Sequence, residues 1–130
     1  MRRIPTMSRY KVRAVRGATT VDRDEPGEIR LAVHEMLDAL LDQNDLTSLD
    51  IVSALFTATP DVVSEFPAHA ARLYGWTDVP LICAQELPVE GALTRCLRVM
   101  LHVETARARH EMRHVYLRNA VLLRQDLLSD

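Results

Sequence analysis

The most regular alternation of apolar and polar side chains in the chain runs through Arg95-Cys96-Leu97-Arg98-Val99-Met100-Leu101-His102-Val103-Glu104. Successive residues of a β-strand point to opposite faces of its sheet, so this two-residue period predicts a strand with one buried face. The face expected in the core carries Leu97, Val99, Leu101 and Val103. The opposite face, which carries Arg98, is then a mixed surface.

Other segments, before and after this one in the sequence, are expected to complete the sheet. They are Tyr10–Arg16, Ile51–Ala58, Val79–Ala84 and Arg113–Leu117. The first alternates in the same way, and the second is mostly β-branched and apolar, which is typical of a buried strand. We expect turns at Gly17–Thr20 and at Thr59–Asp61.

Two segments have the features of helices. The first begins at Asp24-Glu25-Pro26, where an acidic residue and a proline suit the first turn, and Asn44 and Asp45 stop it. Its apolar stripe at helical spacing consists of Ile29, Val33, Met36, Leu37, Leu40 and Leu41. A shorter helix opens at Phe66-Pro67-Ala68 and ends near Gly75, a common residue after a helix C-terminus.

Two helices on one sheet predict an α+β, or mixed α/β, fold: a small single domain with a mixed β-sheet packed by two helices. We place the domain at residues 9–130 and expect residues 1–8 to form a short, disordered extension without the apolar segment of a signal peptide. Residues 118–128 are expected to be a short helical or irregular tail. Two helices do not cover both faces of the sheet, so oligomerisation should bury the second face.

Composition excludes several classes of partner. The chain has 130 residues, a net charge of −2 and a pI of about 6.2, so the protein as a whole does not attract nucleic acid or acidic membranes. No segment reaches the ~18 apolar residues that a membrane span needs, and we expect a cytoplasmic protein. There are fifteen arginines and one lysine, Lys11. Arginine gives planar, bidentate recognition of carboxylates; a bias towards arginine codons would also explain the excess.

Cysteine and histidine do not form a recognisable cofactor site. Cys83 and Cys96 show no disulfide-scaffold spacing, and no motif supplies a base that would make Cys83 a nucleophile. His110 and His114 are four residues apart, but no third metal ligand is evident in the sequence. We therefore expect neither a metal nor another cofactor.

Several short motifs, in order and at characteristic spacing, resemble the AroH-type chorismate mutase family. The most specific are Val15–Val21, Ala58–Asp61, Phe66–Ala68, Arg98–Met100 and Arg113–Leu117. The resemblance runs from about Tyr10 to about Leu127. It implies an enzyme that rearranges chorismate to prephenate, a step towards phenylalanine and tyrosine. It also implies a homotrimer that looks like an α/β-barrel, with active sites at the subunit interfaces.

The resemblance implies a role for each of four residues. Arg98 matches the arginine beside the ether oxygen of the substrate, and Arg16 matches a carboxylate-binding arginine. Glu86 matches the acceptor for the ring hydroxyl, and Tyr116 matches a hydroxyl donor to a substrate carboxylate. A reaction that develops negative charge without moving a proton needs such fixed cations and donors more than an acid–base pair.

The resemblance also implies a wider set of substrate contacts: Phe66, Ala68, His69, Leu81, Ile82, Cys83, Ala84, Gln85, Leu123 and Arg124. Cys83 would be a pocket wall that lends its backbone, and Leu123 and Arg124 would belong to a segment that closes over the site. The chain departs from the family pattern in three places. His69 stands where lysine is frequent, Ile82 where threonine is frequent, and Gln125 where proline is frequent. The cation at residue 69 should therefore depend on pH.

The sequence leaves two alternatives open, one for the role of Arg98 and one for the function of the protein. By strand pattern alone, Arg98 suits a structural ion pair with Glu104 or with an acid of a neighbouring subunit. The protein as a whole could be a non-catalytic small-anion-binding or regulatory trimer that keeps the fold. Retention of Arg16, Glu86, Arg98 and Tyr116 together favours the enzyme.

Overall fold

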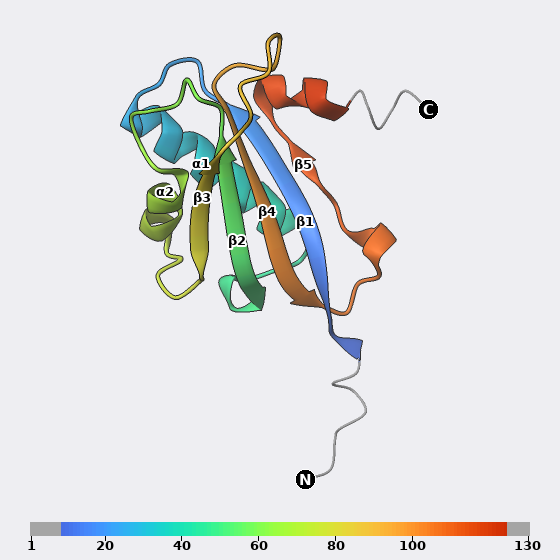
Figure 1. Ribbon diagram of the computed structural model, residues 1–130. Coiled ribbons are helices and arrows are strands. Elements are labelled where there is room, and N and C mark those ends of the chain that lie inside the picture. The colour runs from blue at the N-terminus through green and yellow to red at the C-terminus, as the bar shows by residue number, and fades with distance from the viewer. Residues whose placement is uncertain (1–8, 125–130) are drawn as a thin grey trace.

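The computed structural model describes residues 9–124, which form one layer of sheet and one layer of helices (Figure 1). The strands are β1 (Lys11–Thr20), β2 (Ile51–Ala58), β3 (Leu81–Gln85), β4 (Cys96–Thr105) and β5 (Val115–Tyr116). The α-helices are α1 (Pro26–Gln43) and α2 (Pro67–Tyr74), and three short 3₁₀ helices are η2 (Ser48–Asp50), η3 (Arg109–Glu111) and η4 (Arg118–Arg124). The expected extension at residues 1–8, Gln125 and the end of the expected tail lie outside the described residues.

The sheet is mixed, and its strand order is β3-β2-β4-β1-β5. The central strand β4 pairs antiparallel with both β1 and β2, whereas β3 joins β2 and β5 joins β1 in parallel. The predicted α+β class is therefore confirmed, and the strand that carries Arg98 lies at the centre of the sheet.

Both α-helices cover the same face of the sheet, as Figure 1 shows. Leu97, Val99, Leu101 and Val103 of β4 are at most 2% exposed and belong to the core cluster that includes the apolar side of α1. Asn44 ends α1, and its buried side-chain amide donates to the carbonyl oxygens of Leu40 and Arg113, both at 2.9 Å. Asn44 therefore ties the end of α1 to the segment that leads into β5.

The expected helix and strand positions agree with the structure to within a few residues, with one clear error. Residues 17–20 are not a turn, because they continue β1 and pair with β4 from Gly17↔Val99 to Thr20↔Cys96. The glycine suggested a chain reversal. Its actual role is to let α1 approach the sheet: a Cβ at Gly17 would lie 2.7 Å from Leu40 Cδ1 and 3.1 Å from Met36 Cγ.

Replacing Gly17 with alanine is expected to lower the free energy of unfolding by about 1–3 kcal/mol, the usual cost of overpacking a core. Leu40 and Met36 are fully buried and have little room to move aside. Urea denaturation followed by circular dichroism measures the change. Gly27→Ala is the matched control, because a Cβ there meets nothing within 4 Å and alanine favours the helix. Equal stability of the two variants would contradict close packing at Gly17.

Candidate active site

The face of the sheet that the helices leave open carries three of the four predicted catalytic residues. Strand register places Ala18 between Arg98 of β4 and Tyr116 of β5, so Arg98 and Tyr116 point to the same side. Arg16 lies two residues before Ala18 and therefore on this side as well. All of them come from strands rather than loops, which fixes their relative positions.

Glu86 joins them from the end of β3. Its backbone N–H donates to the carbonyl oxygen of Ala58 at 3.0 Å, which continues the pairing of β3 with β2 by one residue. Together with Arg16, Arg98 and Tyr116, Glu86 lines a cavity of about 310 Å³. The structure thus brings all four predicted catalytic residues into one pocket, here called the sheet pocket. The rest of its wall comes from Gly17, Ala18, Leu55, Thr57, Val99 and Met100.

Arg98 and Glu86 are joined in a bidentate ion pair. The Nε and Nη2 atoms of Arg98 donate to the two carboxylate oxygens of Glu86 at 2.9 and 2.8 Å. Thr57 Oγ1 also donates to Glu86, at 2.6 Å. The hydrogen bond to Glu86 raises the pKa of Arg98 against the opposing effect of burial, so the guanidinium stays charged. Its remaining N–H groups make no hydrogen bond within the described part of the chain and are available to a ligand.

Arg16 and Tyr116, the other two predicted catalytic residues in the sheet pocket, have fewer side-chain partners among residues 9–124. Within residues 9–124, the Arg16 guanidinium has no carboxylate partner, although the backbone N–H of Arg16 donates to Nδ1 of His114 at 3.0 Å. Tyr116 is half-buried. The sheet pocket can therefore offer two arginines and a phenolic hydroxyl to an anion, with one carboxylate as an acceptor.

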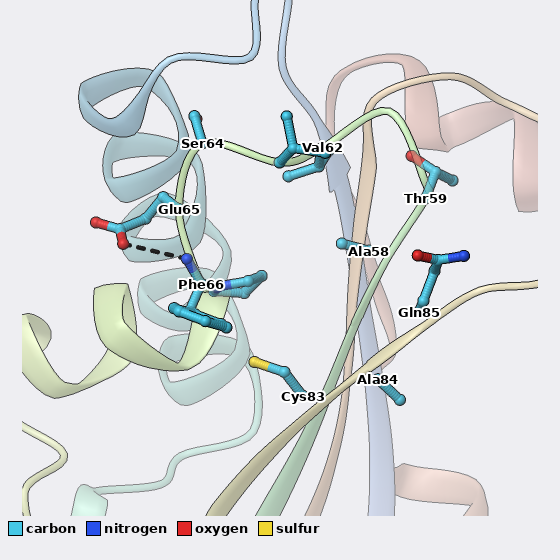
Figure 2. A pocket seen from close by; sticks show the side chains of 11 residues that line it. Ala58, Thr59, Val62, Ser64, Glu65, Phe66, Cys83, Ala84 and Gln85 are labelled. Atoms are coloured by element: carbon cyan, nitrogen blue, oxygen red, sulfur yellow. Dashed lines mark hydrogen bonds between the residues drawn. The ribbon is translucent and has the colours of Figure 1, made fainter.

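A second group of predicted substrate contacts lies elsewhere, around a cavity between β3 and the start of α2. Phe66, Cys83, Ala84 and Gln85 line this cavity of about 490 Å³, here called the helix pocket (Figure 2). None of the described residues lines both the helix pocket and the sheet pocket. The predicted site is therefore divided into two halves within one chain.

Cys83 is a wall of the helix pocket. Its sulfur points towards α2, where the N–H of Ala68 lies 3.4 Å away and donates to it, and burial raises the pKa of the thiol (Figure 2). A thiol with a raised pKa is a poor nucleophile. The predicted role as a pocket wall is consistent with this geometry.

Glu65 organises the entrance to α2. Its side chain is only 7% exposed, yet it receives hydrogen bonds from Arg30 Nε at 2.7 Å and from the N–H of Phe66 at 3.1 Å. His69 Nδ1 lies 3.2 Å from the same carboxylate. Burial opposes ionisation, but these partners outweigh it and lower the pKa of Glu65. His69 is therefore held by Glu65 at the edge of the helix pocket.

The remaining predicted contacts are spread around these two pockets. Ala68 is buried, Leu81 packs against the core, and Ile82 is exposed on the open face of the sheet. Leu123 and Arg124 end η4, and Arg124 lines a further cavity that also includes Tyr116. The structure therefore places Arg124 next to the sheet pocket but does not bring Leu123 into any of the cavities described.

Sequence reasoning missed two residues that hold the site together, Thr57 and Glu65. The four-residue spacing of Glu65 and His69 could have indicated their pairing. The alternation Leu55, Thr57 along β2 could have placed Thr57 on the open face. Among residues 9–124, no three histidine, cysteine or acidic side chains gather closely enough to hold a metal ion. None of the helices in that range combines the length and apolar character needed to cross a membrane.

The chain is similar to known proteins over most of its length. The family model described as chorismate mutase type I matches residues 12–127. The chorismate mutase AroH of Bacillus subtilis is 44% identical over 117 residues, covering 89% of this chain and 92% of that protein. The chorismate mutase AroH of Thermus thermophilus is 46% identical over 119 residues, covering 91% and 98%.

A solved structure agrees with both sequence comparisons. The chorismate mutase from Clostridium thermocellum superposes with a TM-score of 0.82 at 42% identity, and the match covers 84% of this chain and 97% of the other. Sequence and fold thus agree over nearly the whole described chain, and the chain belongs to the chorismate mutase type I family.

Proposed function

We propose that the sheet pocket is the catalytic half of an active site in which this protein rearranges chorismate to prephenate. The observation that carries the proposal is the convergence of Arg16, Glu86, Arg98 and Tyr116 on one cavity. Chorismate carries two carboxylates, an enol ether oxygen and a ring hydroxyl. This pocket offers a complementary donor or acceptor for each kind of group.

The reaction requires orientation and charge stabilisation. In the [3,3] rearrangement a C–O bond breaks while a C–C bond forms, no proton is transferred, and negative charge develops on the ether oxygen. Arg98 is the proposed partner of that oxygen, because its charge is fixed and its ion pair with Glu86 holds the guanidinium plane. Arg16 and Tyr116 would bind carboxylates and hold the flexible substrate in its compact, reactive conformation.

Glu86 has two roles in this proposal. It orients Arg98 and, with its remaining acceptor capacity, accepts a hydrogen bond from the ring hydroxyl. Thr57 fixes the Glu86 carboxylate from the side of β2. A protein that only bound small anions would gain nothing from a carboxylate inside the pocket, so Glu86 favours the enzyme over the non-catalytic alternative.

We further propose that the functional unit is a cytoplasmic homotrimer whose active sites lie between subunits. The helix pocket carries the other predicted contacts, including Phe66 and Cys83, but it is separate from the sheet pocket of the same chain. Large apolar side chains are exposed around both pockets, with Phe66 at 71%, Ile82 at 64% and Leu87 at 80%. Exposure of this kind marks an interaction surface. Apposition of one subunit's helix pocket to the next subunit's sheet pocket would bury these side chains and complete each site.

The direct test is conversion of chorismate by the purified protein after treatment with EDTA. We expect loss of the diene absorbance of chorismate at a rate far above that in buffer, without any added metal or cofactor, because the rearrangement needs neither. The Arg98→Ala variant is the control for a contaminating enzyme. Equal rates for the parent and this variant, or no acceleration by the parent, would contradict the proposed function.

A further inference from the structure

His114 supports Arg16 through a hydrogen bond at the edge of the sheet. Along β1, the backbone groups of Arg16 and Ala18 face the side on which β5 lies, and the carbonyl oxygen of Ala18 accepts the N–H of Leu117 at 2.9 Å. The pairing of β1 with β5 begins only at Gly17↔Val115. The N–H of Arg16 therefore lies just beyond the N-terminal end of β5. The imidazole Nδ1 of His114 accepts this N–H at 3.0 Å in place of a strand carbonyl.

The backbone on either side of His114 is held in place. Before His114, the buried side chain of Asn44 accepts the N–H of Arg113 at 2.7 Å and donates to the carbonyl oxygen of Arg113 at 2.9 Å. After His114, Val115 is buried and paired with β1. The backbone that carries His114 is therefore fixed on both sides, although the residue itself is exposed.

This hydrogen bond determines the protonation state of His114. A backbone N–H can only donate, so Nδ1 must be unprotonated, and the neutral ring carries its proton on Nε2. Burial, and then the charge of Arg16, lower the pKa of His114. A proton added to Nδ1 would remove the acceptor and place a second cation beside Arg16.

The charged groups around the ring also disfavour protonation. On the open face of the sheet, the cavity that includes His114 is lined by Arg13, Arg16, His102 and Arg109. On the other side, the titratable groups are Arg107, His110, Glu111, Arg113, Tyr116 and Arg124. Glu111 is the single acid among them, and its carboxylate accepts the N–H of Ala108 at 2.7 Å. The surroundings of His114 are therefore cationic on both sides.

We propose that His114 is a positioning residue whose neutral imidazole holds the backbone of Arg16 and so aims its guanidinium into the sheet pocket, and whose protonation releases it. This inference rests on the proposed function only for its kinetic consequence. Arg16 is the proposed carboxylate ligand, so loss of its support should weaken substrate binding more than it slows the chemical step. Acidic pH should therefore raise KM and change kcat less.

Three variants test this mechanism through the dependence of KM on pH. In the parent, KM for chorismate is expected to rise as pH falls from 7.5 to 5. His114→Asn places an acceptor oxygen near the position of Nδ1 but cannot titrate, so KM should stay near the parent value at pH 7.5 and no longer rise in acid. His114→Leu removes the acceptor, so KM should be about 3–10 times the parent value at pH 7.5, as for one lost hydrogen bond, and should not rise further in acid. In a His69→Gln background the rise in acid should persist, because this variant keeps His114 and its hydrogen bond to the N–H of Arg16.

Nuclear magnetic resonance of ¹⁵N-histidine-labelled protein provides a readout that does not depend on activity. We expect His114 to carry its proton on Nε2 at neutral pH and to titrate below about pH 6.5, together with the amide resonance of Arg16. A proton on Nδ1, an unchanged acid profile in His114→Asn, or a parent KM in a folded His114→Leu would each overturn the proposal. The expected tautomer in a protein that does not convert chorismate would instead refute the proposed function and leave the hydrogen bond established.

Discussion

Replacing Arg98 with citrulline is expected to lower kcat by roughly 10²–10⁴, equivalent to a barrier increase of about 3–5 kcal/mol. Citrulline has nearly the shape of arginine and keeps most of its donors, but it carries no charge. Charge on the ether oxygen develops mainly in the transition state, so a cation beside it lowers the barrier more than it tightens substrate binding. Two unit charges 4 Å apart interact by ~4 kcal/mol at an effective dielectric constant of 20. Stopped-flow or steady-state assays with chorismate measure the change.

The ion pair with Glu86 makes a second comparison informative. Arg98→Lys keeps the charge but loses the fork that engages both carboxylate oxygens, so we expect an activity between those of the parent and the citrulline variant. Glu86→Gln keeps the shape of the acceptor and leaves Arg98 charged, so this variant removes the charge of the partner and not that of the cation. If the citrulline variant folds, assembles like the parent and keeps kcat within a few-fold of it, Arg98 is not the electrostatic catalyst.

The structure gives Arg98 an ion-pair partner that the sequence did not indicate. Strand alternation correctly placed Arg98 on the less apolar face of β4, and a charge there needs a partner. Glu104 seemed the natural one because it lies on the same face of the same strand. The actual partner within the described chain is Glu86, which arrives from the end of β3 across Thr57 of β2. Sequence order alone does not predict this, because the contact depends on the register of three strands.

Other differences have equally local causes. The helix boundaries were predictable because proline begins both α-helices, and Asn44 and Gly75 follow their last residues. Gly17 was misread because glycine serves both in turns and where two elements pack closely, and the side chains that require it come from α1. His114 was considered only as a metal ligand with His110. Its hydrogen bond to the backbone of Arg16 spans 98 positions of the chain and depends on the parallel pairing of β1 with β5.

Mixing two inactive variants is expected to restore activity if each active site is shared between subunits. One variant is Arg98→Ala, which damages the sheet pocket. The other is Phe66→Asp, which places a carboxylate at the helix pocket, where it would repel a dianionic substrate. Phe66 is 71% exposed and is the N-cap residue of α2, a position that favours aspartate, so this change should leave the fold intact.

Random reassembly after joint unfolding and refolding, or co-expression, gives a quantitative expectation. An intact site needs a sheet pocket from a Phe66→Asp subunit and a helix pocket from an Arg98→Ala subunit, which occurs at about one quarter of the interfaces in an equal mixture. Each variant alone should retain on the order of a hundredth of the parent activity or less, as expected when a dominant electrostatic contact is lost. Activity should thus rise at least tenfold on mixing.

The matched control carries both substitutions on one chain and is mixed equally with the parent. If sites lie between subunits, an intact site needs a parent subunit on each side of its interface, and about one quarter of the sites survive. If each chain contains a complete site, about half survive, and the two single variants do not complement each other. The two arrangements therefore differ in both mixtures. Light scattering then distinguishes a trimer from a dimer, which would complement equally well, and we expect a mass about three times the 14.7 kDa of one chain.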